Sequence, residues 1–299
     1  DPICKRFYMP TIMDQRSFAL TNRFPRTWVE VDLGALRHNL GLIRSAIGPE
    51  PQIAIVAKAD AYGHGLVPIS SFAVRNGADW IAVATVQEGV ALREAGIDSP
   101  IIVISPILEN EAEDAVFFGL RVLVEDFATA KAMSLAAEKL GLIAQIHLEI
   151  DTGLARFGCM PDAAPELAAL ISSLPKTDFE GISSHFFNSS WDVVGTEDQI
   201  RSFHSVLRAC HERGLTFKIE HLANSAGAVR FAQARHQLVR TGIAAYGMDP
   251  YNLFAGEEHP VLSWQARVMV IRELQPGSLV SYGGTYRTRG WEKIATLGV

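Results

Sequence analysis

The sequence predicts an α/β fold: a (β/α)8 TIM-like barrel followed by the start of a β-rich C-terminal domain. Three observations support this prediction. Eight short apolar runs alternate with helical patterns between residues 52 and 240, which is typical of a parallel sheet covered by helices. After Tyr246 the sequence becomes rich in Pro, Gly, Asn and Glu, and from Val261 it is strand-like. A chain of 299 residues is long enough for one large domain and part of another.

The first helix is predicted directly after a short strand candidate at 28–31. Asp32 is a typical N-cap residue, and apolar residues recur at three- and four-residue steps from Leu33 to Ile47. The later helices are expected at 66–76, 127–140, 165–174 and 196–213. The barrel strands are expected at 52–57, 80–84, 101–104, 121–124, 144–150, 179–184, 217–222 and 237–240. Eight such units favour a closed barrel, and an open doubly wound sheet is the structural alternative.

The chain is expected to divide into a barrel over residues 27–248 and the beginning of a β-rich domain over residues 261–299. The segment between them has the composition of a linker. The second domain has only about forty residues, too few for a stable core of its own. We therefore expect it to be incomplete at Val299, and the start at Asp1 leaves open that the chain is part of a longer protein.

Composition and charge exclude several classes of protein. The net charge of −6 and the pI near 5.9 argue against a nucleic-acid-binding surface. No apolar run is long enough to span a membrane. The three cysteines are odd in number and form no C-x-x-C pair, so neither a disulfide framework nor a thiolate metal site is expected. These features favour a reducing, cytoplasmic location and a site without a metal.

Lys58 is the first candidate for chemistry. It ends the apolar run 53–57 and precedes a glycine-rich turn, which places its amine at the carboxyl end of the first barrel strand. An amine that is partly desolvated there has a lowered pKa and can attack a carbonyl. The commoner role of a lysine at a strand end is a solvated surface charge.

Polar residues also follow the later strands, at the end of a barrel where active sites lie. Asn224 and Ser225 open a predicted helix, and Gly242 lets backbone approach closely, so this corner suits a phosphate. A lysine beside a phosphate site implies pyridoxal 5′-phosphate. Taken singly, these polar residues could be a core histidine, ion-paired arginines and a helix cap. The strand-end candidates are Arg156, His185, Asn224, Ser225, Arg240, Gly242 and Ile243.

Six motifs resemble those of the bacterial alanine racemases, which are fold-type III pyridoxal-phosphate enzymes. They occur in the family's order and cover residues 27–299. The most specific is the lysine decapeptide at 56–65. The motifs are Val31-Asp32-Leu33-x-Ala35-Leu36-x-His38-Asn39, Val56-Ala57-Lys58-Ala59-Asp60-Ala61-Tyr62-Gly63-His64-Gly65, Asp151-Thr152-Gly153-x-x-Arg156-x-Gly158, His221-x-x-Asn224-Ser225-Ala226, Arg240-x-Gly242-Ile243-x-x-Tyr246-Gly247 and Val280-Ser281-Tyr282-Gly283.

The resemblance implies a two-base racemase that interconverts L- and D-alanine and supplies D-alanine for peptidoglycan. Lys58 would hold the cofactor and act as the base on one face of the substrate. Tyr282 would be the opposite base, supplied in trans by the partner of a homodimer. Arg156 would orient the cofactor and the substrate carboxylate. The remaining cofactor-binding residues implied are Tyr62, His185, Asn224, Ser225, Arg240, Gly242 and Ile243, with Arg240 at the pyridine nitrogen.

Two positions depart from the family pattern. Glu149 stands where the family usually has a carbamylated lysine, and we predict that its carboxylate pairs with Arg156. The run 186–190 is larger and less acidic than in the family, which leaves the substrate preference open. Two alternative functions are a non-catalytic pyridoxal-phosphate homeostasis barrel, which would lack Tyr282, and the racemase half of a fusion with a cell-wall ligase.

Overall fold

The computed structural model describes residues 7–9 and 25–299. The chain divides into two compact units. The larger unit is Leu33–Val261, and the smaller one combines the described residues before Leu33 with Leu262–Val299. The barrel was expected to begin at residue 27, but residues 27–32 belong to the smaller unit. The difference arises because β2 (Thr27–Val31) pairs with β11 (Leu262–Ala266) along its whole length.

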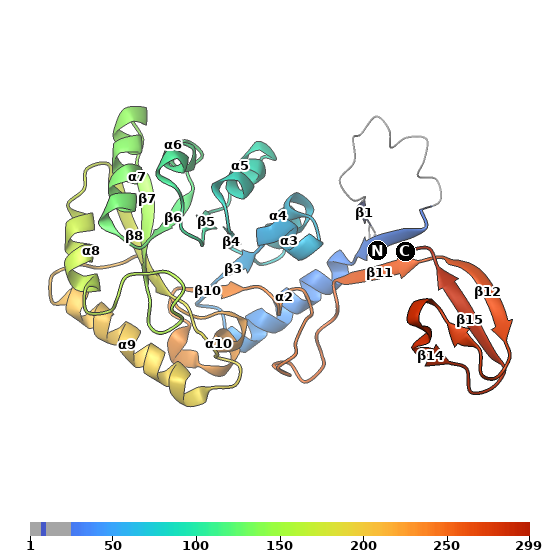
Figure 1. The fold of residues 1–299 in the computed structure, drawn as a ribbon. Helices are drawn as coiled ribbons and strands as arrows, with labels where there is room; N and C mark the ends of the chain where they lie inside the picture. The colour runs from blue at the N-terminus through green and yellow to red at the C-terminus, as the bar shows by residue number, and fades with distance from the viewer. Residues whose placement is uncertain (1–6, 10–24) are drawn as a thin grey trace. The chain divides into compact units, whose positions relative to one another are not determined.

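The larger unit contains the eight-stranded parallel sheet that the sequence predicts. The sheet order is β10-β3-β4-β5-β6-β7-β8-β9, so the last strand pairs with the first and the sheet curls into a nearly closed barrel (Figure 1). One backbone hydrogen bond, from Arg240 N to Ala223 O at 3.0 Å, crosses the seam between β9 and β10. The strands are β3 (Gln52–Val56), β4 (Trp80–Val83), β5 (Ile101–Val103), β6 (Arg121–Val124), β7 (Ala144–Ile150), β8 (Thr177–Ser184), β9 (Ile219–His221) and β10 (Leu238–Thr241).

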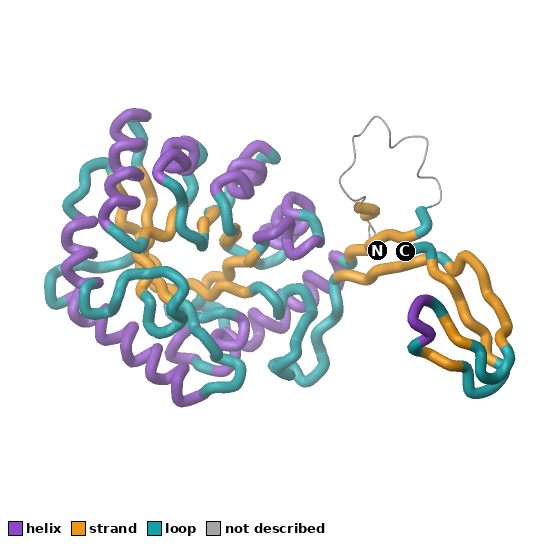
Figure 2. The backbone as a smooth tube through the Cα atoms, viewed as in Figure 1, coloured by secondary structure: helices purple, strands orange, loops and turns teal. Residues whose placement is uncertain are grey.

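Helices cover the outside of the barrel (Figure 2). Their ends follow local sequence signals: Asp126 caps α7 by accepting a hydrogen bond from Thr129 N at 2.7 Å, and Gly141 ends it with a φ of 70°. None of the described helices is long and apolar enough to cross a bilayer. The helices are α2 (Leu33–Ile47), α3 (Lys58–Gly63), α4 (Leu66–Arg75), α5 (Val86–Glu94), α6 (Ala112–Phe117), α7 (Phe127–Leu140), α8 (Ala164–Ser172), α9 (Val193–His211) and α10 (Ser225–Arg230), with 3-10 turns η1 (Glu109–Glu111) and η2 (Ala232–Ala234).

Apolar side chains fill most of the barrel interior. Every residue of β4 and β5 is buried, and fully burying one such aliphatic side chain contributes about 1.5–3 kcal/mol. A ligand can therefore enter only at the end of the barrel where the strands finish. One interior cluster is Ala54, Val56, Trp80, Ala82, Ile102, Leu123, Ile219 and Leu238.

The smaller unit is entirely antiparallel in its strand pairing. The strand-like sequence from Ser263 to Ile271 forms two strands, which separate at Arg267. The strand that begins at Leu279 ends at Val280, because Ser281 has a φ of 60° and interrupts the extended backbone. Besides β2 and β11, the elements are β1 (Phe7–Met9), β12 (Val268–Leu274), β13 (Leu279–Val280), η3 (Tyr282–Gly284), β14 (Tyr286–Arg287) and β15 (Glu292–Leu297).

Asn39 joins α2 to the segment that follows the barrel. Its Nδ2 donates to Ala245 O at 3.1 Å and to His259 O at 2.8 Å, and its Oδ1 accepts from His259 N at 2.8 Å. The side chain is buried. The amide therefore holds the linker against the first helix, beside His38, whose ring stacks on His259.

We predict that Asn39→Ala lowers the free energy of unfolding by about 2–4 kcal/mol, because it leaves several buried polar groups without partners. Urea denaturation measures this loss. The exposed neighbour Arg37 provides the control: Arg37→Ala should stay within about 0.5 kcal/mol. Equal effects of the two substitutions would contradict the structural role assigned to Asn39.

Candidate active site

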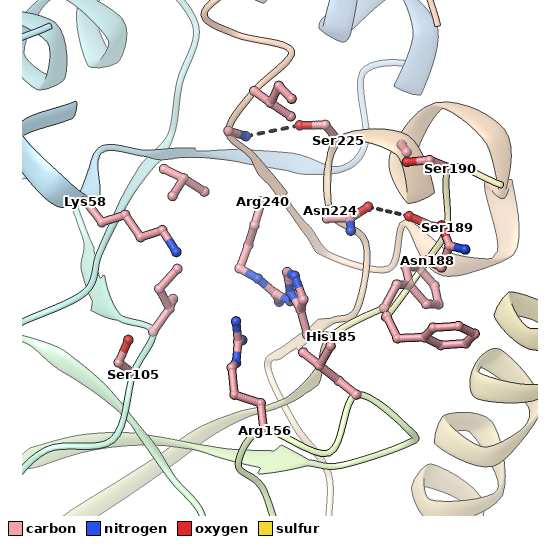
Figure 3. A pocket seen from close by; sticks show the side chains of 18 of the residues that line it. Lys58, Ser105, Arg156, His185, Asn188, Ser189, Ser190, Asn224, Ser225 and Arg240 are labelled. Carbon is pink, nitrogen blue, oxygen red and sulfur yellow. Dashed lines mark hydrogen bonds between the residues drawn. The ribbon is translucent and has the colours of Figure 1, made fainter. Parts of the chain in front are cut away.

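A cavity of about 540 Å³ opens at the carboxyl ends of the barrel strands. Every site residue that the sequence predicts within the barrel lines it. Lys58, Arg156 and Arg240 extend into it from different segments of the chain (Figure 3). The predicted residues found together there are Lys58, Tyr62, Arg156, His185, Asn224, Ser225, Arg240, Gly242 and Ile243.

Lys58 begins a left-handed turn. The four residues 59–62 have φ values of 52–54°, although none is glycine, and such a conformation costs roughly 1–2 kcal/mol per residue. Two carboxylates hold the turn: Glu88 Oε1 accepts from Ala59 N, and Asp60 Oδ1 accepts from Leu66 N, each at 2.7 Å. The turn therefore fixes the lysine at the cavity and places Tyr62 on the cavity wall.

Arg240 is the most extensively bonded side chain of the site. Its Nη2 donates to Ser184 O at 2.7 Å and to His185 Nδ1 at 3.1 Å, and its Nη1 donates to His221 Nδ1. An arginine can only donate, so both histidines accept through Nδ1. Within the described residues, Nε of Arg240 makes no hydrogen bond. This N–H is the donor left for a ligand.

The histidines beside Arg240 are neutral. Burial, followed by the charge of Arg240, lowers the pKa of His185 to about 3. The same two causes hold the pKa of His221 well below its ordinary value. Arg240 requires neutral rings as partners. Its guanidinium can only donate, and a protonated ring would present an N–H donor to it in place of an acceptor.

Glu149 lies buried at the end of β7 and accepts a hydrogen bond from Ser183 Oγ. Burial raises the pKa of this carboxyl group, and the nearby charge of Arg240 opposes the rise more than that of Arg156 does. The guanidinium of Arg156 instead lies over the ring of Phe157, at 4.7 Å. The predicted ion pair between Glu149 and Arg156 is therefore replaced by a hydrogen bond to Ser183.

The corner predicted to hold a phosphate is lined by uncharged groups. Asn224 caps α10 by accepting from Gly227 N at 2.9 Å, and Ser225 Oγ accepts from Gly242 N at 3.1 Å. A Cβ added at Gly242 would lie 3.1 Å from Tyr62 Oη, so a larger residue would crowd the tyrosine. The sequence motifs therefore converge on one corner of the cavity.

The sequence interpretation did not assign several lining residues to the site. Ser189 Oγ donates to Asn224 Oδ1 at 2.8 Å and so fixes the cap of α10. No motif indicated this, although the unusual run 186–190 was noted. Tyr282, predicted as a base, begins η3 in the smaller unit and is fully exposed there. The other lining residues missed include Ser105, Leu154, Met248 and Tyr251.

Barrel, lysine and polar corner together define an α/β-barrel protein with an amine and a polar corner in one cavity. A family model described as alanine racemase, N-terminal domain, matches residues 31–250, and the chain belongs to this family. It is 37% identical over 278 residues to an alanine racemase of Symbiobacterium thermophilum, covering 91% of this chain and 73% of that protein.

Solved structures agree with this assignment. An alanine racemase of Clostridium difficile 630 superposes with a TM-score of 0.84 at 31% identity, covering 92% of this chain and 73% of that one. An alanine racemase from a D-cycloserine-producing Streptomyces lavendulae superposes with a TM-score of 0.85 at 29% identity, covering 90% of this chain and 72% of that one. The resemblance inferred from the motifs is thus confirmed at the level of family and fold.

We predict that acid destabilises the fold through the buried histidines His147, His185 and His221. Burial lowers the pKa of each, so they stay neutral when folded, whereas unfolded histidines bind protons below about pH 6.5. The free energy of unfolding therefore keeps its full value above that pH. Below it, this free energy falls as the pH falls, with a slope approaching about 1.4 kcal/mol per pH unit for each histidine.

Urea denaturation between neutral pH and about pH 5 measures this slope. His185→Gln should lower the slope of the free energy of unfolding against pH by the contribution of one histidine. A free energy of unfolding that stays constant over the interval would contradict the prediction.

Proposed function

We propose that this protein is a pyridoxal-phosphate-dependent racemase that interconverts L- and D-alanine. The observation that carries the proposal is the convergence of Lys58, Arg240 and the corner around Gly242 on one cavity. Membership of the alanine racemase family supports the same reaction.

The residues present fit the cofactor. The uncharged corner of Tyr62, Ser225 and Gly242 would take its phosphate, and the free Nε–H of Arg240 would face its ring nitrogen. Lys58 Nζ would hold it covalently. When bound, the cofactor withdraws electrons from Cα of an amino acid, which makes the Cα proton acidic. Arginine keeps its own proton, so the ring nitrogen opposite Arg240 would stay unprotonated.

Racemisation requires a proton to leave one face of Cα and another to arrive on the opposite face, so two bases must flank the carbon. Lys58 would hold or release the proton at one face. Tyr282 of the partner subunit in a homodimer would do so at the other, an assignment that rests on its motif. Arg156 would orient the substrate carboxylate through its guanidinium.

A second candidate function is a barrel that binds the cofactor without catalysis. The phenol of Tyr282 and the β-rich unit favour the racemase, because a binding barrel needs neither. We also propose a cytoplasmic location and a role in supplying D-alanine for peptidoglycan. A fusion with a cell-wall ligase is compatible with every feature of the barrel.

Deuterium exchange at Cα tests the racemase proposal. With added cofactor in D₂O, the protein should catalyse the incorporation of solvent deuterium at Cα of both L- and D-alanine, as followed by NMR. Lys58→Ala should abolish exchange, and Tyr282→Phe should reduce racemisation by about 10²–10⁴-fold, because it removes one of the two proton-transfer groups. Cofactor absorbance without exchange from either enantiomer would support the binding barrel instead.

We predict that Glu149→Gln weakens cofactor binding and turnover by about ten-fold, because it removes the nearby carboxylate whose charge offsets the burial of the Arg240 guanidinium. Absorbance titration and racemisation assays measure the two quantities. Glu138, exposed on α7, provides the control, and Glu138→Gln should change neither. Unchanged affinity and turnover in Glu149→Gln would refute the electrostatic role.

A further inference from the structure

A chain of polar side chains crosses the otherwise apolar barrel interior behind the site. It takes one residue from each of five consecutive strands, β6 to β10. His221 and His147 bond ring to ring at 2.9 Å, and His147 Nε2 lies 3.1 Å from Glu180 Oε2. Both rings are fully buried. In order, the chain is Arg240, His221, His147, Glu180 and Arg121.

The hydrogen bonds from Arg240 to Glu180 all point the same way, and Arg121 donates to Glu180 from the other side. Arg240 Nη1 donates to His221 Nδ1, so a neutral His221 carries its proton on Nε2. His221 Nε2–H donates a hydrogen bond to His147 Nδ1. His147 therefore carries its own proton on Nε2, which faces Glu180 Oε2. Glu180 accepts at the end. The carboxylate therefore favours the tautomer in which His221 Nδ1, the nitrogen that faces Arg240, is free to accept.

The charge states agree with this direction. Burial alone would raise the pKa of Glu180, but the hydrogen bond from His147 and the charge of Arg121 hold it at about 2. Burial lowers the pKa of His147 and His221. The chain thus consists of a carboxylate and two neutral rings between two arginines, and each polar group has a partner.

The backbone makes room for this arrangement. Pairing between β7 and β8 shifts register between Ile146 and His147, where the partners are Phe179 and Gly181. Glu180 is the extra residue of this bulge, a device that re-aims a side chain. A Cβ at Gly181 would lie only 2.4 Å from His147 Nδ1, so only glycine accommodates the ring. Two independent backbone features serve the same pair of side chains.

We propose that Glu180 is a positioning residue of the active site. Through His147 and His221 it keeps an acceptor, rather than a donor, against the Arg240 guanidinium, and so holds that group in place for the ligand. The contact between Arg240 and the cofactor ring rests on the proposed function. The positions of the protons on His147 and His221 do not depend on that function.

Removing the acceptor reverses the chain. Without a carboxylate, His147 can hold its proton on Nδ1, His221 must then accept through Nε2, and its own Nδ1–H would oppose the Nη1–H groups of Arg240. Glu180→Met removes the acceptor at similar volume. Glu180→Gln keeps an oxygen that can accept from both His147 and Arg121, which share Oε2 in the wild type.

The test begins with ¹⁵N NMR of the histidine side chains in the cofactor-free protein. We expect the wild type and Glu180→Gln to carry the His221 proton on Nε2, and Glu180→Met to carry it on Nδ1. A wild-type His221 protonated on Nδ1 overturns the proposal without any variant. Ile171→Val, a buried change on α8, is the destabilised control and should leave the proton on Nε2.

Cofactor binding and kinetics form the second arm. Glu180→Met should weaken cofactor binding and lower kcat for alanine by about ten-fold. KM should change little, because Arg156 lies outside the chain. Glu180→Gln should restore both quantities. Equal affinity and kcat in Glu180→Met and wild type overturn the proposal, whereas a wild type that neither binds cofactor nor racemises alanine contradicts only the proposed function.

Discussion

The buried guanidinium of Arg240 is the constraint on which the rest of the site depends. A cation inside a barrel is costly unless its donors are paired, and here backbone carbonyls and two histidine nitrogens accept from both Nη groups, leaving only Nε–H unpaired among the described residues. Those partners come from β8 and β9, across the seam that the sheet leaves without a continuous ladder. The same side chain therefore closes the barrel and presents one N–H to the cavity.

The cavity is positively charged overall. Lys58, Arg156 and Arg240 line it, while Glu149 is its one acidic lining residue among those described. Neutral histidines add nothing to this balance. A site with such an excess favours ligands that carry anionic groups at more than one end, as a phosphate ester joined to an amino acid does.

Sequence periodicity was sufficient for the barrel, because alternating strands and helices have few compact solutions. Motifs were sufficient to predict which strand-end residues lie around one cavity. The motifs gave the wrong partner for Glu149. Its residue type revealed the charge, but not that Ser183 lies closer to the carboxylate than Arg156 does. They were silent on Glu180, because a bulge in strand pairing leaves no mark on a single sequence.

The turn after Lys58 has the handedness of a helix built from D-amino acids. Four L-residues in this mirror-image conformation store several kcal/mol of backbone strain, which the surrounding barrel must counterbalance. A semisynthetic protein with D-alanine at position 59 or 61 would relieve part of that strain while keeping the lysine where it is. The segment that presents the amine is thus held in its shape by its neighbours rather than by its own preferences.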